Sequence, residues 1–206
     1  MIHPARAATT AARGPRPPRR RGRLPAHRPR GPPARRHAPL WEDHITWTRL
    51  AIVSFAGSLP DLSAIQARLL RNQSDIAAAI RPDYGRSAER RLRTLLREHI
   101  TGAVTLLGAA KGGDTAAVGR AQRAWYANAN EIADFLSGAN PRHWPRGETR
   151  AMMKTHLDLT LKEAVDRLNG RFDADVLDYE AVHRSILEMA DMLRDRIVAQ
   201  SPERFR

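Results

Sequence analysis

Apolar side chains recur at three- and four-residue steps along most of the chain after Pro39, which is the spacing that gathers side chains on one face of a helix. The clearest such face lies between residues 86 and 110 and consists of Leu92, Leu96, Ala103, Leu106 and Ala110. The same spacing predicts further helices over residues 40–58, 62–80, 115–140, 148–169 and 173–200. No stretch alternates polar and apolar residues as a half-buried strand would, so the sequence predicts an all-α protein.

Glycine and proline residues separate these helices and indicate how they are connected. The pair Gly112 and Gly113 ends one helix, and Gly170 ends another. Pro60 leaves so little loop between residues 58 and 62 that the first two segments are expected to form one kinked rod. We therefore predict an all-α, up-and-down bundle of four long rods, the first kinked at Pro60, plus a closing C-terminal helix, with residues 39–206 as a single domain.

The first residues have a different composition. The chain of 206 residues has a net charge of +13, and residues 1–37 hold 11 of its 35 Lys and Arg residues and no acidic residue, so the remainder carries only +2. Eight of the 14 prolines lie in the same stretch. Since such a segment buries too little apolar surface to offset the entropy of ordering, residues 1–38 are predicted to be a disordered Arg/Pro-rich tail.

The tail leaves partner and compartment open. It could bind nucleic acid or an anionic lipid surface through its arginines, or be an inert extension or the product of a start codon placed too far upstream. It lacks the apolar core of an export signal, and no later run is long enough to span a membrane. The chain as written is expected to be cytoplasmic, and exported if its true start lies elsewhere.

Polar residues interrupt several apolar faces. His44, His99 and His156 stand on the apolar faces of three different helices, and Asn72 and Asn128 stand on two more. Facing helices of a bundle build metal sites from inward side chains, and imidazole suits the zinc, iron and copper class of divalent ions. The same residues could instead satisfy one another in a buried hydrogen-bonded network, or line a pocket for a small organic ligand.

The metal hypothesis takes the three histidines as ligands, although no HExxH or repeated ExxH motif fixes two of them locally. Carboxylates that could serve as further ligands, or orient the histidine ligands, are Asp43, Glu98, Glu131, Asp158 and Asp191, and the base of a metal-dependent enzyme would be Asp191 or Glu98. No cysteine is present, so thiolate ligands and disulfides are excluded.

Other side chains allow two interpretations each. Arg49 and Arg68 could clamp an anionic ligand, or form structural bridges with Asp43 and Asp75. The tryptophans at positions 41, 47, 125 and 144 could line a pocket, but on helical faces they are more typical of core. His183 is expected to lie at an interface between helices or to face solvent, and Trp144 is expected to order the loop over residues 138–147.

Several strings occur together in a recognisable order. These are LWEDHITWTR (40–49), ARLLRNQSDI (67–76), PDYGRSAERRLRTLLREHI (82–100), WYANANEIADFLSGANPRHWP (125–145), MMKTHLDLT (152–160), DYEAVHRSILEMADML (178–193) and QSPERF (200–205). In this respect the chain resembles an uncharacterised bacterial all-helical family whose members are sometimes labelled acetylglutamate kinase or glycosyltransferase. Members often begin with an export signal, in place of which this chain has the Arg/Pro tail.

The resemblance covers roughly residues 40–205 and implies a site but no reaction. The family's recurrent polar and aromatic positions match Trp41, His44, Arg49, Asn72, Tyr84, His99, Trp125, Asn128, Asn140, Trp144, His156 and Asp191. A kinase would need a Gly-rich phosphate loop, and the one glycine pair lacks its lysine and hydroxyl. Three hypotheses follow: a bundle with a buried His/Asn cluster that binds a divalent metal or small ligand, a metal-dependent enzyme that uses this cluster, and an interaction protein that acts through its tail.

Overall fold

The computed structural model describes residues 37–205, and all its regular elements are helices. They are α1 (His37–Ala56), α2 (Leu62–Ala79), α3 (Arg81–Lys111), α4 (Thr115–Ala139), α5 (Arg146–Leu168), α6 (Phe172–Gln200) and a final 3-10 turn, η2 (Pro202–Phe205). The predicted all-α class is thus confirmed for the described residues. The predicted tail falls, apart from its last two positions, on residues 1–36, which lie outside them.

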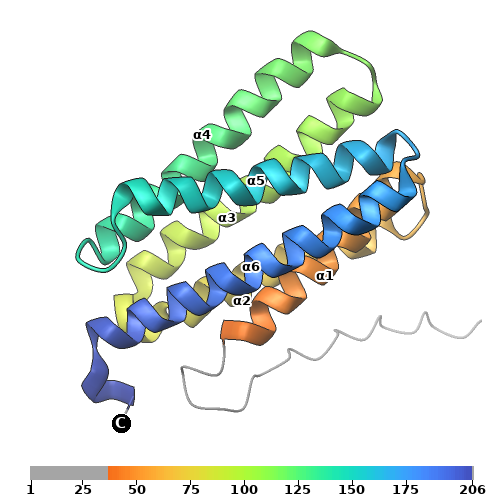
Figure 1. Ribbon diagram of the computed structural model, residues 1–206. Helices are drawn as coiled ribbons and strands as arrows, with labels where there is room; N and C mark the ends of the chain where they lie inside the picture. Colours follow the sequence, from red (N-terminus) through yellow and green to blue (C-terminus); the bar gives the residue numbers. More distant parts are fainter. Residues whose placement is uncertain (1–36, 206) are drawn as a thin grey trace, which may run out of the picture.

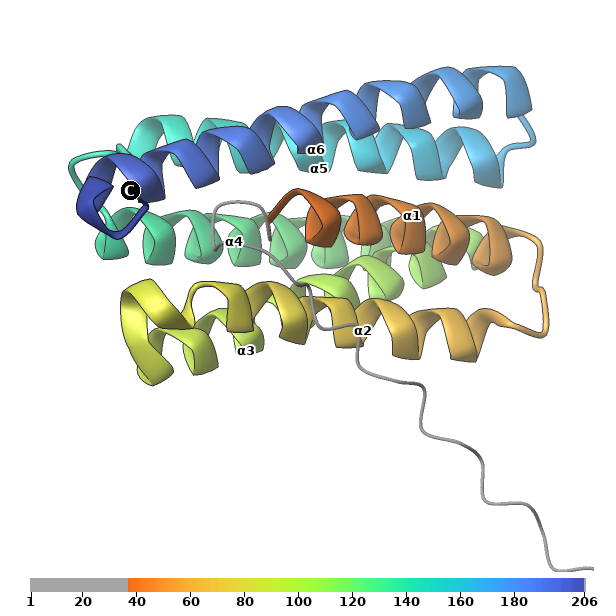
Figure 2. The same ribbon diagram turned by 90° about the horizontal axis from the view of Figure 1, so that it is seen from below.

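The helices form an antiparallel bundle in which each helix packs on the next one in the chain, and α1 closes the set by packing on α5 and α6. Figure 2 shows α5 and α6 as one layer and α2 and α3 as the opposite layer, with α1 and α4 between them. Short connections enforce this order, because a helix that ends at a tight turn must run back along itself. The core therefore lies along the axis of a six-helix ring (Figure 1).

The expectation of one rod kinked at Pro60 is wrong, because α1 and α2 are separate helices packed side by side. The last turn of α1 is closed by Gly57 N–H donating to Val53 O and Leu59 N–H donating to Ser54 O. Ser58 then adopts a φ of 52°, a left-handed conformation that turns the chain out of the helical path. The proline follows a reversal that has already been made, and the bundle has six helices instead of four rods and a closing helix.

A second reversal joins α2 to α3. Asp83 N–H and Tyr84 N–H donate to Ile80 O, so residues 81–84 form one helical turn. Gly85 then breaks the helix with φ 81° and ψ 177° before α3 resumes. Glycine is needed at position 85 because side-chain-bearing residues rarely adopt that conformation.

The loop between α4 and α5 is ordered by Trp144, as predicted. Its indole is 1% exposed and lies 5.8 Å from the Tyr84 ring, measured between centroids. Ser137 Oγ donates to Trp144 O at 2.8 Å, and Trp144 N–H donates to Asn140 O at 2.7 Å. The loop therefore caps one end of the bundle core.

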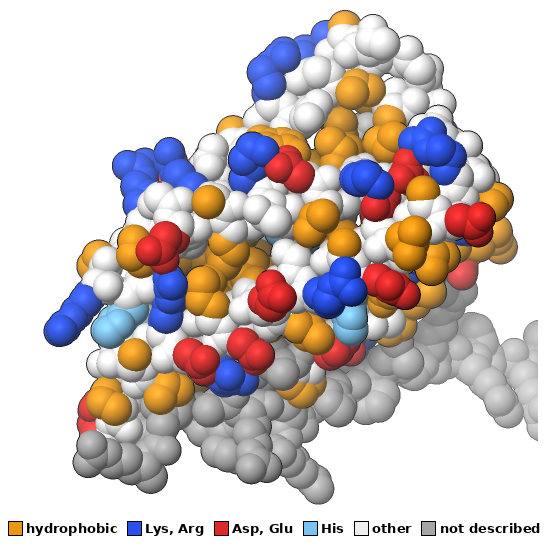
Figure 3. All heavy atoms as spheres, viewed as in Figure 1, with side chains coloured by type: hydrophobic (Ala, Val, Ile, Leu, Met, Phe, Trp, Pro, Cys, Tyr) orange, Lys and Arg blue, Asp and Glu red, His pale blue; other side chains and the backbone are white. Residues whose placement is uncertain are grey.

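The face that α5 and α6 present (Figure 3) carries side chains of both charges. On the face shown in Figure 3, acidic and basic side chains are interspersed over α5 and α6 with small apolar areas between them. No helix among residues 37–205 is long and apolar enough to cross a membrane.

Gly85 offers a direct test of the second reversal. We expect Gly85→Ala to lower the free energy of unfolding by roughly 1–3 kcal/mol, because alanine is strained at this φ. A Cβ at Gly85 would meet no atom within 4 Å, so any loss reports the backbone conformation alone. Gly108→Ala is the matched control in α3, where a Cβ also meets nothing within 4 Å and φ is not positive. It should raise the free energy of unfolding by up to ~1 kcal/mol, and urea denaturation that ranks the two variants the other way would contradict this account.

Candidate functional site

Three histidine rings meet in the middle of the bundle, and we call them the histidine layer: His44 on α1, His99 on α3 and His156 on α5. Each residue is 5% exposed. The centroid of the His156 ring lies 5.9 Å from that of His44 and 6.2 Å from that of His99, so His156 stands next to both. His44 and His156, which are 112 positions apart in the chain, are thus brought together, as their places on apolar helix faces predicted.

His44 is held by a chain of amides on α2. Its Nδ1 lies 3.1 Å from Gln73 Nε2, which also donates to Leu69 O and to Asn72 Oδ1, both at 3.1 Å. Asn72 Nδ2 in turn donates to Leu40 O at 2.9 Å. Asn72 therefore belongs to the site as predicted, but it acts through Gln73, which the sequence analysis did not identify.

His99 is held by α4. Its Nδ1 lies 2.9 Å from Asn128 Oδ1, and Asn128 Nδ2 donates to Leu95 O at 3.2 Å. The Trp125 ring stacks on His99 with centroids 5.2 Å apart, while its Nε1 donates to His99 O at 3.0 Å. The amide and the indole together fix the plane of this imidazole.

His156 has only a weak partner within its own helix. Its Nδ1 lies 3.4 Å from Thr160 Oγ1, whose hydroxyl donates to His156 O at 2.8 Å. No described residue makes a hydrogen bond to the Nε2 of any ring in the histidine layer. All three rings are thus engaged through Nδ1 alone.

The histidine layer lines a cavity of about 50 Å³ on the bundle axis, to which all six helices contribute. At roughly 10–15 Å³ for each water-sized group, it has room for about four of them. Its lining is mostly apolar and consists of Trp41, His44, Gln73, Ile76, Ile80, Leu92, Leu96, His99, Ile132, Leu136, Trp144, Met153, His156, Met189, Leu193 and Ile197. No side chain with a permanent charge faces the cavity.

A second cavity, of about 60 Å³, lies one helical turn further along the axis. Thr48, Leu69, Ala103 and Thr160 line it, each four residues from a histidine-layer residue or from Gln73 and each in the same direction along the bundle. Four residues of helix span about 6 Å. One layer of side chains therefore separates two apolar spaces.

Burial keeps the histidine layer uncharged. It lowers the pKa of His44 to about 3, with a further contribution from His99. It lowers the pKa of His99 to about 4, against the hydrogen bond to Asn128, which raises it. The pKa of His156 is lowered well below 6.5 by burial and by both neighbouring rings. At neutral pH the layer consists of neutral imidazoles.

The carboxylates expected to complete a metal site lie elsewhere. Asp191 is exposed and accepts a hydrogen bond from Arg194 at 2.7 Å, so its predicted place in the cluster is wrong. Glu98 is also exposed, and Glu131 pairs with Arg91. Across residues 37–205, no group of three or more His, Asp or Glu side chains is placed to hold a metal ion.

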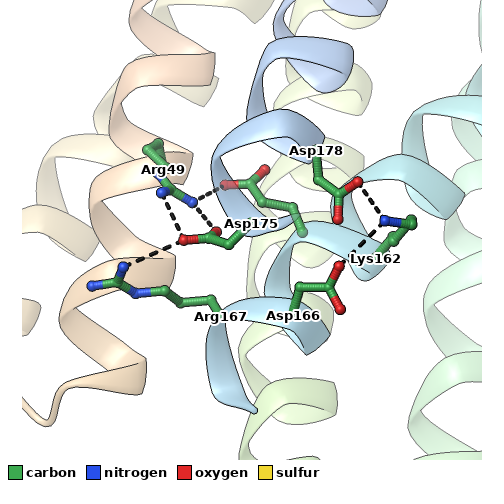
Figure 4. A network of polar contacts seen from close by, with 7 residues as sticks. Arg49, Lys162, Asp166, Arg167, Asp175 and Asp178 are labelled. Carbon is green, nitrogen blue, oxygen red and sulfur yellow. Dashed lines mark hydrogen bonds and ion pairs between the residues drawn. The ribbon is translucent and has the colours of Figure 1, made fainter. Parts of the chain in front are cut away.

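Arg49 lies outside the histidine layer and joins α1 to the α5–α6 hairpin (Figure 4). Its guanidinium makes a two-pronged contact with the fully buried Asp175, in which Nη2 donates to Oδ2 at 2.8 Å and Nη1 bonds Oδ1. Nη1 also donates to Glu163 Oε1 at 3.0 Å, and Arg167 Nη1 donates to Asp175 Oδ2 at 3.3 Å. The expected bridge to Asp43 is made by Arg68, at 2.6 Å.

Glu163 is the unusual member of this network. It is 1% exposed, and burial raises its pKa to about 7 even though Arg49 favours the charged form. Neither Glu163 nor Asp175 was expected from the sequence, where both look like ordinary polar residues of an exposed helix face. The network accounts for Arg49 without a ligand.

The four tryptophans and His183 were also considered in the sequence analysis, and they lie partly in the core and partly near the surface. Trp41, Trp125 and Trp144 are buried, the first and last of them in the wall of the cavity. Trp47 is half-buried beneath the Arg68 guanidinium, 5.1 Å from its ring centroid. His183 Nε2 lies 2.9 Å from Glu42 Oε2 near the surface, as expected for a residue that faces solvent.

Comparison of the chain with protein-family models, with curated proteins and with solved structures finds no match in any of the three. The family resemblance therefore stays a prediction, and the function has to be argued from the site.

The neutral histidine layer predicts how stability depends on pH. Each ring is neutral when folded but gains a proton below pH ~6.5 when unfolded, so its contribution is present above that pH and lost below it. Glu163 acts in the opposite direction, because its raised pKa gives stability at low pH that is lost as the pH rises through about 7. The three histidines together outweigh Glu163. We therefore expect the free energy of unfolding to rise by about 2 kcal/mol per pH unit between pH 5 and 6.

Urea denaturation over this pH range measures the slope. His99→Leu should reduce the slope by about half, because it removes one of about two net protons, and Glu163→Gln should make the slope steeper, because it removes the group that opposes the histidines. Leu59→Ala, which changes an exposed residue without an ionisable group, should leave it unchanged. A free energy of unfolding that is flat between pH 5 and 6 would show that the rings are not held neutral.

Proposed function

We propose that this protein binds a small, uncharged and largely apolar molecule in the cavity at the histidine layer. The observation that carries the proposal is that three neutral imidazoles, each engaged through Nδ1 only, face a cavity whose other walls are almost entirely apolar. Such a space, with a few converging polar groups, is typical of small-molecule sites. The rings would orient the ligand, and the apolar walls would supply most of the affinity.

The charge of the ligand follows from the walls. A buried ion needs an opposite charge or several hydrogen bonds to offset its lost hydration. The cavity is lined by neutral rings, the Gln73 amide, the indoles of Trp41 and Trp144 and hydrocarbon, and the buried Trp144 Nε1 has no hydrogen-bond partner among the described residues. The ionic network around Arg49 is already paired internally. An uncharged molecule avoids this cost, and its apolar portion has a second space available one turn further along the axis.

A divalent ion of the zinc, iron or copper class is the second candidate. In its favour, each Nδ1 has a polar partner, which is how the outer nitrogen of a metal-bound histidine is usually oriented, and the ring centroids lie 5.9 and 6.2 Å apart. A metal-dependent enzyme would also need a base near the rings, and both candidates for that role, Glu98 and Asp191, are exposed. We therefore propose binding ahead of catalysis.

Pyrrole is a suitable first probe of the cavity, because it is uncharged and compact. We expect it to shift the NMR resonances of the three histidine rings and of the Trp144 indole. Leu96→Phe should weaken binding by roughly tenfold or more, because the larger ring takes up cavity space. Leu59→Phe is the control, since Leu59 is 43% exposed and far from the cavity lining. Equal affinity in both variants, or no shift at the rings, would overturn the proposal.

Elemental analysis of purified protein tests the second candidate. If a metal is bound, the wild type should retain it stoichiometrically, His99→Ala should lose it, and His183→Ala should keep it, because His183 lies outside the layer. Circular dichroism shows whether each variant is folded. Metal-free wild type that also takes up no Zn²⁺ or Cu²⁺ on dialysis would remove this candidate and leave the first untouched.

A further inference from the structure

The proton on His44 is placed by its neighbour. Gln73 Nε2 lies 3.1 Å from Leu69 O, Asn72 Oδ1 and His44 Nδ1, and its two N–H groups are shared among these three acceptors. The two oxygens accept only, and that of Asn72 is fixed because Asn72 Nδ2 donates to Leu40 O. The group 3.1 Å from His44 Nδ1 is therefore an amide nitrogen, which has no lone pair to accept a hydrogen bond. Since Nδ1 cannot carry a proton against an N–H group, the proton of the neutral ring lies on Nε2.

The proton on His99 lies on the other nitrogen. Asn128 Nδ2 donates to Leu95 O, which turns Asn128 Oδ1 toward the ring. A carbonyl oxygen only accepts, so His99 Nδ1 carries the proton and donates it across 2.9 Å. The Nε2 of His99 is left with a lone pair.

His156 follows His99. The Thr160 hydroxyl donates its single proton to His156 O at 2.8 Å, so only its lone pairs are available to the ring. His156 Nδ1, 3.4 Å away, is therefore the protonated nitrogen, and its Nε2 also carries a lone pair.

We infer that the histidine layer reads the hydrogen-bonding pattern of its ligand, with one N–H donor on His44 and lone pairs on His99 and His156. The matching ligand carries an N–H or O–H donor next to an acceptor, as in a neutral azole or an alcohol. A carbonyl or ether, which only accepts, leaves both lone pairs unmatched, and an unmatched buried polar group costs affinity. This inference rests on the proposed small-molecule function and specifies the ligand class.

The same pattern separates an organic ligand from a metal ion. A metal needs a lone pair from every ring that coordinates it, and His44 presents a proton instead. To supply a third lone pair, His44 would have to move its proton to Nδ1, against the Gln73 amide group. Two rings are ready for a metal and the third is not.

The first test is the protonation of the rings themselves. Two-dimensional ¹H–¹⁵N correlation of the histidine side chains, on full-length protein dialysed against a chelator at pH 7.5, distinguishes protonated from unprotonated ring nitrogens. We expect Nε2–H for His44 and Nδ1–H for both His99 and His156. Nδ1–H on His44, or Nε2–H on His99 or His156, overturns the inference whether or not any ligand binds.

The second test uses pyrazole, pyrrole and furan, which are five-membered aromatic rings of nearly equal size. Pyrazole offers a donor beside an acceptor, pyrrole offers a donor only, and furan offers a weak acceptor only. We expect pyrazole to bind roughly tenfold more tightly than pyrrole, and pyrrole roughly tenfold more tightly than furan, because each step removes about one net hydrogen bond. Equal affinities for the three overturn the inference but leave the proposed function standing, whereas binding of none overturns the proposed function.

Gln73→Leu tests the origin of the preference. It removes the amide that forbids a proton on His44 Nδ1, so the ratio of pyrazole to pyrrole affinity should fall toward one. Gln66→Leu on the same helix, in the wall of the second cavity, is the matched control and should keep the wild-type ratio. If Gln73→Leu does not fold, as judged by circular dichroism, the ring protonation of the wild type still decides the inference. An unchanged ratio in folded Gln73→Leu contradicts the role given to Gln73.

Discussion

The absence of charge on three buried imidazoles is the constraint on which the centre of this bundle depends. The centroids of two of the rings lie about 6 Å from that of the third. The three rings could not all be protonated in an apolar core, because each charge would lose its hydration and repel the others. Neutrality makes every ring both a donor and an acceptor. The amides of Gln73 and Asn128 and the hydroxyl of Thr160 then decide which ring nitrogen donates and which accepts, and of these three residues only Gln73 lines the cavity.

A second polar network, formed around Arg49, lies at the edge of the core and has a different role. The contact of Arg49 with Asp175 and Glu163 joins α1 to the α5–α6 hairpin, where the ring of helices closes. Replacing such a buried ionic group by hydrocarbon often costs little stability, whereas removing one partner is expensive. The network is therefore better understood as fixing where α1 sits than as a source of net stability. That position places His44 in the layer.

Periodicity predicted the helices and the inward direction of the histidines, because both follow from spacing along a single helix. What it could not give were relations between helices. Asp191 was expected as a carboxylate of the cluster but is exposed, while Gln73, Glu163 and Asp175 looked like surface residues and are buried by neighbours that spacing does not identify. The reversal before Pro60 depends on the positive φ of Ser58, and serine carries no strong sequence signal for that conformation.

The order of the helices also has a consequence for how the chain reaches its native state. Five of the six helix pairs in the ring are neighbours in the sequence, so they can form as local hairpins with little loop entropy to overcome. The pairing of α1 with α6 joins the two ends of the described chain. It is therefore the pairing with the largest loss of chain entropy. The cavity is lined from both of these helices, so a partly folded chain with every hairpin made still lacks the binding site. Formation of the site therefore requires ring closure, and a bound molecule, which contacts all six helices, would oppose the opening of the seam between α1 and α6.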